Sequence, residues 1–370
     1  MDPIALTQAL VRLDSVNPPG NEEACARLVA DVLQHAGFAV RLHALAPGRS
    51  SLVATLGAGG DKPRLAFTGH FDTVPLGLAP WKFDPCGGEI SEGRLYGRGS
   101  SDMKSGIAAF VTAAVHSASF LRERAGVALV MTAGEETGCD GAQALASAGA
   151  LPSHVGALIV AEPTANQPVL GHKGALWLRA CTHGKAAHGS MPEKGDNAIF
   201  KLARAACAIE GYRPAGEHYF FGRSTLNLGT IKGGSNINSV PDWAAMEIDI
   251  RSVPGVNHPD LVADIQRYLG GAVTIEHRLD LAPVYTDASD SWVQSLVRAV
   301  ESKSGPSLAK NAATYFTDAS VLKPAFGNVP TVILGPGEPS MAHQADEYCF
   351  VDRIHEAVSI YEALIRDWMG

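Results

Sequence analysis

The stretch GVALVMT at residues 126–132 runs directly into AGEETG at residues 133–138. An apolar run of this length that ends in a glycine-bounded polar turn predicts a strand buried on both faces of a sheet. Other short apolar runs predict strands at 51–56, 64–68, 157–161 and 331–334. Apolar residues at helical spacing predict helices at 21–36, 105–118, 289–304 and 351–368. This alternation predicts an α/β fold, in which helices cover both faces of a mixed sheet.

The pattern changes in the middle of the chain. Strand patterns at 176–180, 225–231 and 244–251 and helical patterns at 197–209 and 258–269 suit two helices on a mostly antiparallel sheet. We therefore expect a smaller α+β domain at residues 173–283. It is inserted into an α/β domain that is made of residues 1–172 and 284–370.

Composition and charge narrow the class of protein. The chain has 370 residues, of which 46% are apolar and 18% charged, as in ordinary globular proteins. Thirty Lys and Arg against 38 Asp and Glu give a formal net charge of −8, which argues against a nucleic-acid partner. No apolar run approaches the roughly 18 residues of a membrane span, and no secretory signal begins the chain, so we expect no membrane partner. The six cysteines lack disulfide-like spacing, which favours reduced thiols and a cytoplasmic location.

Two histidines and several carboxylates stand just after predicted strands or just before a predicted helix. These residues are His70, Asp72, Asp102, Glu135, Glu136, Glu162 and His343. In an open α/β sheet the carboxyl ends of the strands share one edge, where ligands bind. We therefore expect these side chains to converge at that edge, although they are far apart in sequence.

This set of side chains predicts a metal centre. Mixed imidazole and carboxylate ligands suit zinc, with manganese and cobalt as alternatives. Two neighbouring ions need a bridging carboxylate and two further protein ligands each, and five residues supply that number: His70, Asp102, Glu136, Glu162 and His343. Glu135 is then left without a metal, and a free carboxylate beside the ions is what a general base requires. Asp72 lies two residues after His70 and can hydrogen-bond its imidazole.

Five segments of the chain, in this order, resemble those of one enzyme family. They are GHFDTVP at 69–75, LYGRGSSDMKSG at 95–106, TAGEETG at 132–138, AEPT at 161–164 and AHQADEY at 342–348. The chain resembles the acetylornithine deacetylase and succinyl-diaminopimelate desuccinylase family over nearly its whole length, and it is nearer the acetylornithine deacetylase branch. The resemblance implies a metal-dependent amide hydrolase with a dinuclear zinc catalytic domain. It also implies that the inserted domain is a lid that mediates homodimer formation.

The resemblance further implies roles at the metal centre. One site is completed by His70 and Glu162 and the other by Glu136 and His343, with Asp102 bridging them. Glu135 is the implied general base, and Asp72 is implied to orient His70.

In the inserted domain, the resemblance points to residues that act on the substrate. His188, in the segment GKAAHG at 184–189, is implied to reach the active site of the neighbouring subunit and stabilise the oxyanion. Asn238 and Arg251 match residues that contact substrate, and an Arg can bind a carboxylate bidentately. Thr317 is a further candidate for substrate contact.

The first expected function is hydrolysis of the amide bond of an N-acylated amino acid, a small-molecule substrate. A dipeptidase or exopeptidase with the same dinuclear centre is the alternative, because only the shape of the substrate pocket separates the two. A third hypothesis is a binding protein that kept the fold and lost catalysis. The complete ligand set and Glu135 argue against it.

Overall fold

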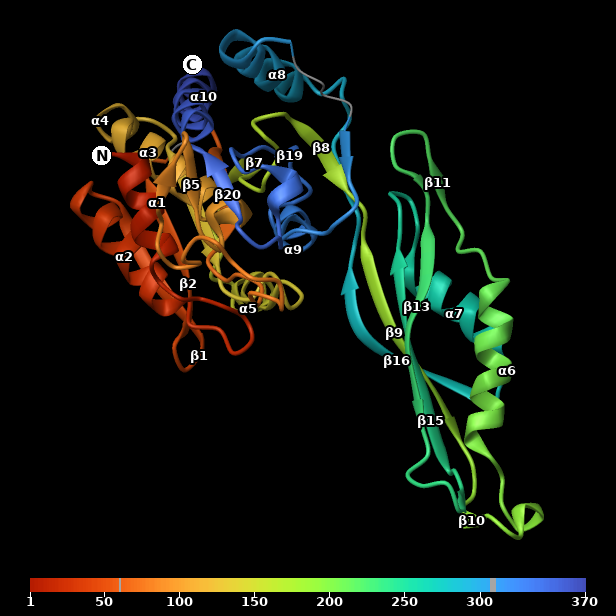
Figure 1. Cartoon of the computed structure of the whole chain (residues 1–370). Coiled ribbons are helices and arrows are strands. Elements are labelled where there is room, and N and C mark those ends of the chain that lie inside the picture. The colour runs from red at the N-terminus through yellow and green to blue at the C-terminus, as the bar shows by residue number, and fades with distance from the viewer. Residues whose placement is uncertain (60, 307–310) are drawn as a thin grey trace. The chain divides into compact units, whose positions relative to one another are not determined.

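The chain folds into two compact units (Figure 1). The structure is a computed structural model that describes residues 1–59, 61–306 and 311–370. The large unit comprises residues 1–171, 285–311 and 317–370, and the small unit comprises residues 172–284 and 312–316. The chain of the large unit is therefore interrupted twice.

A mixed sheet forms the middle of the large unit. Its strands lie in the order β1 (Ala39–Ala46), β2 (Arg49–Leu56), β6 (Val127–Thr132), β3 (Arg64–His70), β7 (Val155–Val160), β19 (Thr331–Ile333), β8 (Val169–His172) and β17 (Val284–Tyr285), and β18 (Asn311–Ala313) pairs with β8. The four strands β6, β3, β7 and β19 are parallel, whereas β1–β2, β2–β6 and β19–β8 are antiparallel pairs. Every residue of β6 is buried, as a strand covered on both faces requires.

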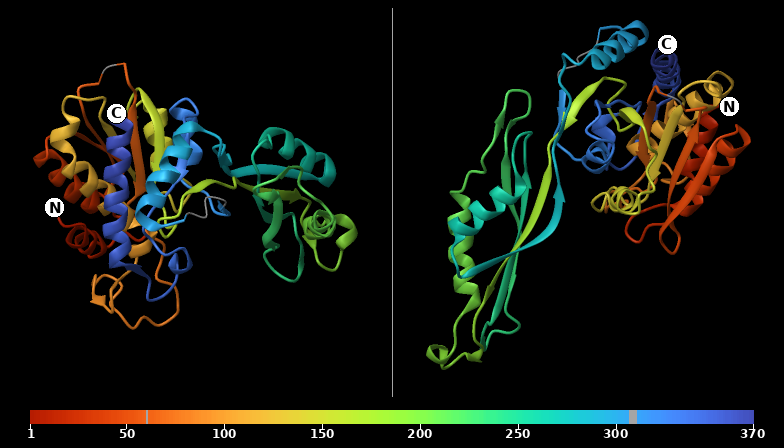
Figure 2. Two further views of the ribbon diagram at one scale, coloured as in Figure 1. Left: turned by 90° about the horizontal axis from the view of Figure 1, so that it is seen from above. Right: turned by 180° about the vertical axis from the view of Figure 1, so that it is seen from behind.

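Helices cover both faces of this sheet (Figures 1 and 2). One face carries α1 (Pro3–Val11), α2 (Glu23–His35), α3 (Ser105–His116), α8 (Ser291–Ser304) and α10 (Val351–Met369), and the other carries α5 (Asp140–Ser147) and α9 (Ala319–Ala325). The ring of Phe67 on β3 lies 5.9 Å from that of Phe110 on α3 and 5.3 Å from that of Tyr361 on α10. These buried rings fix α3, and the turn that leads into it, against β3.

A small antiparallel sheet joins two distant parts of the large unit. Its strands are β20 (Tyr348–Phe350), β5 (Arg94–Tyr96) and β4 (Ile90–Ser91), and Tyr348 stands opposite Tyr96. The short helix α4 (Ala118–Leu121) follows α3. The pairing of β20 with β5 brings the segment after residue 342 beside the turn at Ser100–Lys104.

The small unit is an antiparallel sheet with two helices packed on it. The strand order is β13 (Thr225–Gly233), β15 (Trp243–Arg251), β9 (Ala175–His183) and β16 (Val273–Leu281), and the helices are α6 (Ala198–Glu210) and α7 (His258–Leu269). Leu202 of α6 and Ile265 of α7 share one core with Leu178 of β9 and Met246 of β15. Two-residue strands form the pairs β10 (Ala187–His188) with β14 (Ser239–Val240) and β11 (Glu217–His218) with β12 (Gly222–Arg223).

The predicted fold class is confirmed, since a helix-covered mixed sheet and a separate, smaller α+β unit are both present. Within the described ranges, none of the helices combines the length and the apolar character needed to cross a bilayer.

Some elements lack the pattern that would have predicted them. β16 is an edge strand whose middle residues are largely exposed, so its apolar alternation is weak. The helix α9 contains Pro324, a residue that argues against a helix interior. Propensity and patterning therefore missed elements whose place is set by tertiary packing.

Candidate metal centre

Two overlapping groups of metal-ligating side chains lie at one edge of the sheet in the large unit. β3 ends at His70, the segment after β6 carries Glu136, Glu162 follows β7, and His343 lies on the segment after β19. Asp102 comes from the turn that leads into α3. Because these four strands are parallel, their carboxyl ends meet at the same edge. The structure thus brings the five predicted ligand residues together.

The first group consists of His70, Asp102 and Glu162. His70 Nε2 lies 3.2 Å from Asp102 Oδ1 and 3.6 Å from Glu162 Oε1. The other ring nitrogen, Nδ1, lies 2.9 Å from the backbone carbonyl oxygen of Asp72, which can only accept a hydrogen bond. In the neutral ring this contact places the proton on Nδ1 and leaves the Nε2 lone pair directed at the two carboxylates.

The second group consists of Asp102, Glu136 and His343. His343 Nε2 lies 3.4 Å from Asp102 Oδ2 and 3.3 Å from Glu136 Oε2. The two oxygens of Asp102 therefore face different histidines, which is the arrangement of a carboxylate shared between two ions. The side chain of His343 is 51% exposed, whereas that of His70 is 2% exposed, so the second group is the more accessible.

The residues present fit a pair of divalent ions. Each group offers one imidazole nitrogen and two carboxylates, the donor types that zinc binds. Among the described residues, Glu135 Oε1 and Glu136 Oε1 are buried and find no hydrogen-bond partner. Buried polar atoms of this kind call for a partner that the protein itself does not supply. His70, Asp102 and Glu162 would hold one ion, and Asp102, Glu136 and His343 the other.

Burial and crowding shift the pKa values at this centre. Burial raises the pKa of Glu135 and of Glu162 well above the usual range, and neighbouring carboxylates add to both shifts. Burial alone would raise the pKa of Asp102 too, but hydrogen bonds from His343 and His70 lower it. Contacts with Asp102 and Glu136 raise the pKa of His343 to about 10. The metal-free centre therefore keeps protons that a cation has to displace.

Asp72 supports the segment that carries Glu135 and Glu136. Its Oδ1 accepts from Glu135 N at 3.1 Å, and its Oδ2 accepts from Glu136 N at 3.2 Å and from Asn17 Nδ2 at 2.9 Å. Toward His70, the backbone carbonyl of Asp72 is nearer than the carboxylate, whose Oδ1 lies 3.5 Å from Nδ1. Asp72 thus lies beside His70 and also positions Glu135. No sequence pattern indicated the contact with Glu135.

Two further groups beside the centre were missed by sequence reasoning. Glu347, four residues after His343, is fully buried and forms an ion pair with Arg98. Asp318 is also buried and accepts a hydrogen bond from Thr132 Oγ1, and burial raises the pKa of Asp318 to about 6. Each is an acidic residue in a polar segment, where a solvated position is the ordinary expectation.

Thr317, the further candidate for substrate contact, lies just before α9. Its side chain is fully buried, and its Oγ1 accepts a hydrogen bond from Ala319 N at 3.1 Å at the start of α9. No part of Thr317 is exposed in this structure, and its contact with a substrate stays a prediction.

The candidate residues of the small unit are held by local contacts. His188 is exposed, and its Nδ1 lies 2.7 Å from Ser190 Oγ. Asn238 is also exposed. The Arg251 guanidinium pairs through Nε with Asp249 Oδ1 at 3.0 Å, with both side chains about one third exposed. Arg251 therefore already has one carboxylate partner within its own strand.

A hydrogen-bond chain in the small unit has the order of a serine-hydrolase triad. Ser252 Oγ lies 2.7 Å from His258 Nε2, and His258 Nδ1 lies 2.5 Å from Asp280 Oδ1. Ser252 is fully buried, so its oxygen cannot be reached by a substrate. We interpret this series of hydrogen bonds as a structural link between the end of β15, α7 and β16.

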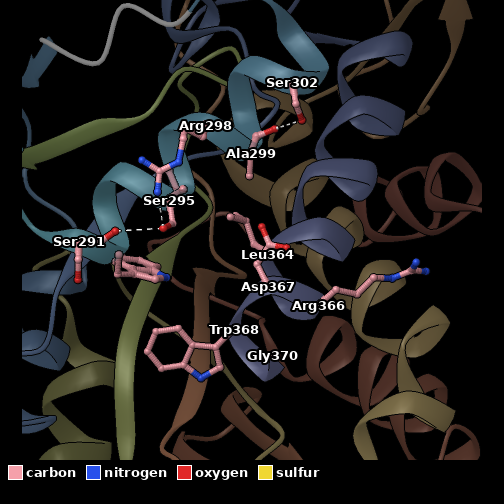
Figure 3. Close-up of a pocket in the computed structure, with 12 residues that line it drawn as sticks. Ser291, Ser295, Arg298, Ala299, Ser302, Leu364, Arg366, Asp367, Trp368 and Gly370 are labelled. Atoms are coloured by element: carbon pink, nitrogen blue, oxygen red, sulfur yellow. Dashed lines mark hydrogen bonds between the residues drawn. The ribbon is translucent and has the colours of Figure 1, made fainter.

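A cavity on the large unit lies away from these ligand groups, between α8 and α10 (Figure 3). Ser295 and Arg298 of α8 and Leu364 and Trp368 of α10 are among its lining residues. None of the metal-ligating side chains lines it. It is therefore not part of the candidate metal centre.

Comparison with known proteins places the chain in a family. Residues 66–367 match the model of peptidase family M20/M25/M40. The probable succinyl-diaminopimelate desuccinylase of Staphylococcus epidermidis is 31% identical, over 100% of this chain and 98% of that protein. The acetylornithine deacetylase of Vibrio cholerae is 29% identical, over 96% of this chain and 93% of that protein. The chain belongs to peptidase family M20/M25/M40, a family of dinuclear metal-dependent amidohydrolases and peptidases, which confirms the predicted family. The nearer likeness to the acetylornithine deacetylase branch stays a prediction, because relatives of both names match almost equally.

Solved structures share the fold over the whole chain. The M20 family metallo-carboxypeptidase Sso-CP2 of Sulfolobus solfataricus has a TM-score of 0.81 at 19% identity, covering 100% of this chain and 99% of that one. The YXEP protein of Bacillus subtilis, described as a dinuclear metal binding peptidase, has a TM-score of 0.73 at 13% identity, covering 99% and 97%. At these identities the likeness supports the fold alone.

Proposed function

We propose that this chain hydrolyses the amide bond of an N-acylated amino acid with the help of two divalent ions. The observation that carries the proposal is the pair of ligand groups that share Asp102, with the buried carboxyl of Glu135 beside them. Zinc is the preferred ion, with cobalt and manganese as alternatives. Bound in these groups, the ions supply a Lewis acid for the carbonyl oxygen and lower the pKa of water.

Glu135 acts as the general base in this proposal. It accepts a proton from the water that attacks the amide carbon, and it returns this proton to the amine nitrogen as the C–N bond breaks. A carboxyl whose pKa is raised suits both steps, since the group has to take up the proton and then release it. The contact between Asp72 and the Glu135 amide fixes the position of the base.

Three residues of the small unit complete the proposed chemistry. His188 donates a hydrogen bond to the oxyanion, and Asn238 and Arg251 bind the amino-acid part of the substrate. The exposure of His188 and Asn238 supports these roles. Arg251 is partly exposed and can accept a second carboxylate beside Asp249.

We further propose a homodimer formed through the small unit. In the described sheet β13 is an edge strand, on which Ile231 is 54% exposed, and Phe200 of α6 is 65% exposed. Apolar side chains and a free strand edge suit pairing with a second copy.

The proposed location is the cytoplasm, which is consistent with six free cysteines.

A peptidase of the same centre is the second candidate. The solved structures of this fold include a metallo-carboxypeptidase and a dinuclear metal-binding peptidase. The two functions share their chemistry and differ in the group attached to the scissile amide.

The test is a substrate panel. The protein is assayed with N-acetyl and N-succinyl amino acids and with dipeptides, in the presence of zinc, cobalt or manganese, and the released amine is measured. We expect turnover of acylated amino acids, which Asp102→Ala abolishes. Turnover of dipeptides alone would favour the peptidase, and bound metal without any turnover would favour a binding protein.

A further inference from the structure

We propose that Glu347 is a positioning residue of the metal centre, which holds the segments that carry Asp102 and His343 in a fixed relation. The inference rests on the proposed function, because it takes these two residues as metal ligands. Glu347 does not itself belong to either ligand group.

The carboxylate of Glu347 is surrounded by donors from the Asp102 segment. Its Oε1 accepts from Ser101 N and Asp102 N, both at 2.9 Å, and its Oε2 accepts from Gly99 N at 3.0 Å and from Arg98 Nη1 at 2.6 Å. The three backbone amides among these donors, within residues 99–102, fix the backbone at and just before the proposed bridging ligand. Since Glu347 is fully buried, water cannot replace any of them without a large cost.

Arg98 extends the same link to the His343 segment. Its Nη1 also donates to the backbone carbonyl of Gln344 at 3.2 Å, and its Nη2 donates to that of Pro75 at 3.3 Å. Glu347 and Arg98 together therefore join the residue after His343 to the turn that carries Asp102.

The His343 segment needs such an anchor because its backbone is strained. His343 has φ of 65° and Asp346 has φ of 54°, in the left-handed region that residues with a Cβ rarely adopt. Strained positions persist where the surroundings determine the backbone conformation. Glu347 follows Asp346 directly and supplies that constraint.

The two ligand groups depend on Glu347 to different degrees. In the second group, both Asp102 and His343 lie on the linked segments. In the first group only Asp102 does, because His70 ends β3 and Glu162 follows β7. Loss of the carboxylate should therefore weaken the second group more than the first.

The test uses Glu347→Gln, which keeps the shape and replaces one acceptor oxygen by a donor. Metal-free protein is titrated with Co²⁺ and followed by its visible absorbance, and Zn²⁺ affinities are obtained by competition with a chelator. His343→Ala and Glu162→Ala assign the binding steps, since each removes a ligand of one group. We expect a loss of about 10–100-fold in affinity at the second group, the range typical of residues that orient ligands, and a smaller loss at the first.

Glu338→Gln is the matched control. Glu338 lies on the same segment, but its carboxylate pairs with Arg353 at 2.7 Å and accepts hydrogen bonds from Ser340 rather than from residues 97–102, so both affinities should stay unchanged. Urea unfolding of the metal-free variants separates loss of stability from loss of metal. If Glu347→Gln does not fold, Arg98→Lys, which removes the fork to Gln344 and Pro75, is judged by the same unequal loss.

Unchanged affinities, or equal losses at both groups, in a folded variant would overturn the inference while leaving the proposed function intact. A wild-type chain that binds no divalent ion would instead count against the proposed function.

Discussion

Neighbouring charges, rather than residue type, distinguish the carboxylates of this centre. Asp102 lies between His70 and His343, and their hydrogen bonds lower its pKa although it is buried. Glu135 has no such close partner for Oε1, and burial raises its pKa. Asp102 is thereby kept charged for binding cations. Glu135 shares its raised pKa with Glu162, so its place outside both ligand groups, rather than its pKa alone, marks it as the candidate base.

The role of Glu135 can be tested by Glu135→Gln. Gln keeps the size of the side chain but cannot accept the proton, so we expect kcat to fall about 10²- to 10⁴-fold, the usual contribution of a general base. Metal analysis should still find about two ions per chain, because Glu135 belongs to neither ligand group. Glu136→Gln serves as the contrast and should lose metal. A fully active Glu135→Gln enzyme would assign proton transfer to another group.

Metal binding at His343 should depend on pH. The pKa of His343 is raised to about 10 in the metal-free centre, so below that pH its imidazole carries a proton that coordination has to displace. Affinity for the second ion should therefore rise with pH, by about tenfold per pH unit for one displaced proton. Titrations with Zn²⁺ at pH 6, 7 and 8, in buffers of different ionisation enthalpy, measure both the slope and the proton release. In His343→Ala this proton is absent, and its contribution to the slope should vanish. A pH-independent affinity in the wild type would contradict the assignment.

At the scale of elements, close packing between α3 and β7 sets the position of Glu162. Gly106 lies in the first turn of α3, and a Cβ added there would stand 2.1 Å from the backbone oxygen of Ala161, the residue before Glu162. A glycine at this place therefore allows the helix to reach the edge of the sheet that carries the ligands.

Gly106→Ala should destabilise the protein. Ala is favoured over Gly in a helix by about 1 kcal/mol, so propensity alone predicts a gain. Forcing a methyl group into this contact should outweigh that gain and cost about 1–3 kcal/mol net, and it should weaken metal binding at the first group through Glu162. Gly271→Ala is the control, because nothing lies within 4 Å of its added Cβ. Urea unfolding and metal titration provide the two readouts. A Gly106→Ala protein as stable as the wild type would mean that the helix shifts without cost.

Much of the element order could be predicted from the sequence because the central strands are short, continuous apolar runs between glycines. The run at 126–132 and the helix at 105–118 are examples, and β6 and α3 match them closely. Most of the ligand residues could be predicted because they follow such a run, whereas Asp102 could be predicted because it stands just before the helix at 105–118. Glu347, Arg98 and Asp318 could not be found in this way, because their burial depends on contacts across more than a hundred residues of sequence. Such contacts leave no periodic pattern of apolar residues in the local sequence.

At the scale of the whole molecule, the match to the family spans both units, since residues 66–367 include the entire small unit. The small unit has its own core and an exposed edge strand, β13. Such an independent unit is suited to carry subunit contacts without disturbing the metal centre.

The proposed dimer and the proposed role of His188 can be tested together. His188→Ala should leave the metal content unchanged and lower kcat about 10²- to 10³-fold, the usual effect of losing one oxyanion donor. If His188 serves the partner's site, mixing the inactive His188→Ala and Glu135→Ala proteins under subunit exchange should restore part of the activity. In a mixed dimer, one centre then has an intact Glu135 and receives the intact His188 of the other chain. Ile231→Glu on β13 is the control, because a charge on the proposed contact should reduce dimer formation in sedimentation experiments and abolish the recovery. Proven exchange without any recovery would mean that His188 acts in its own chain or not at all.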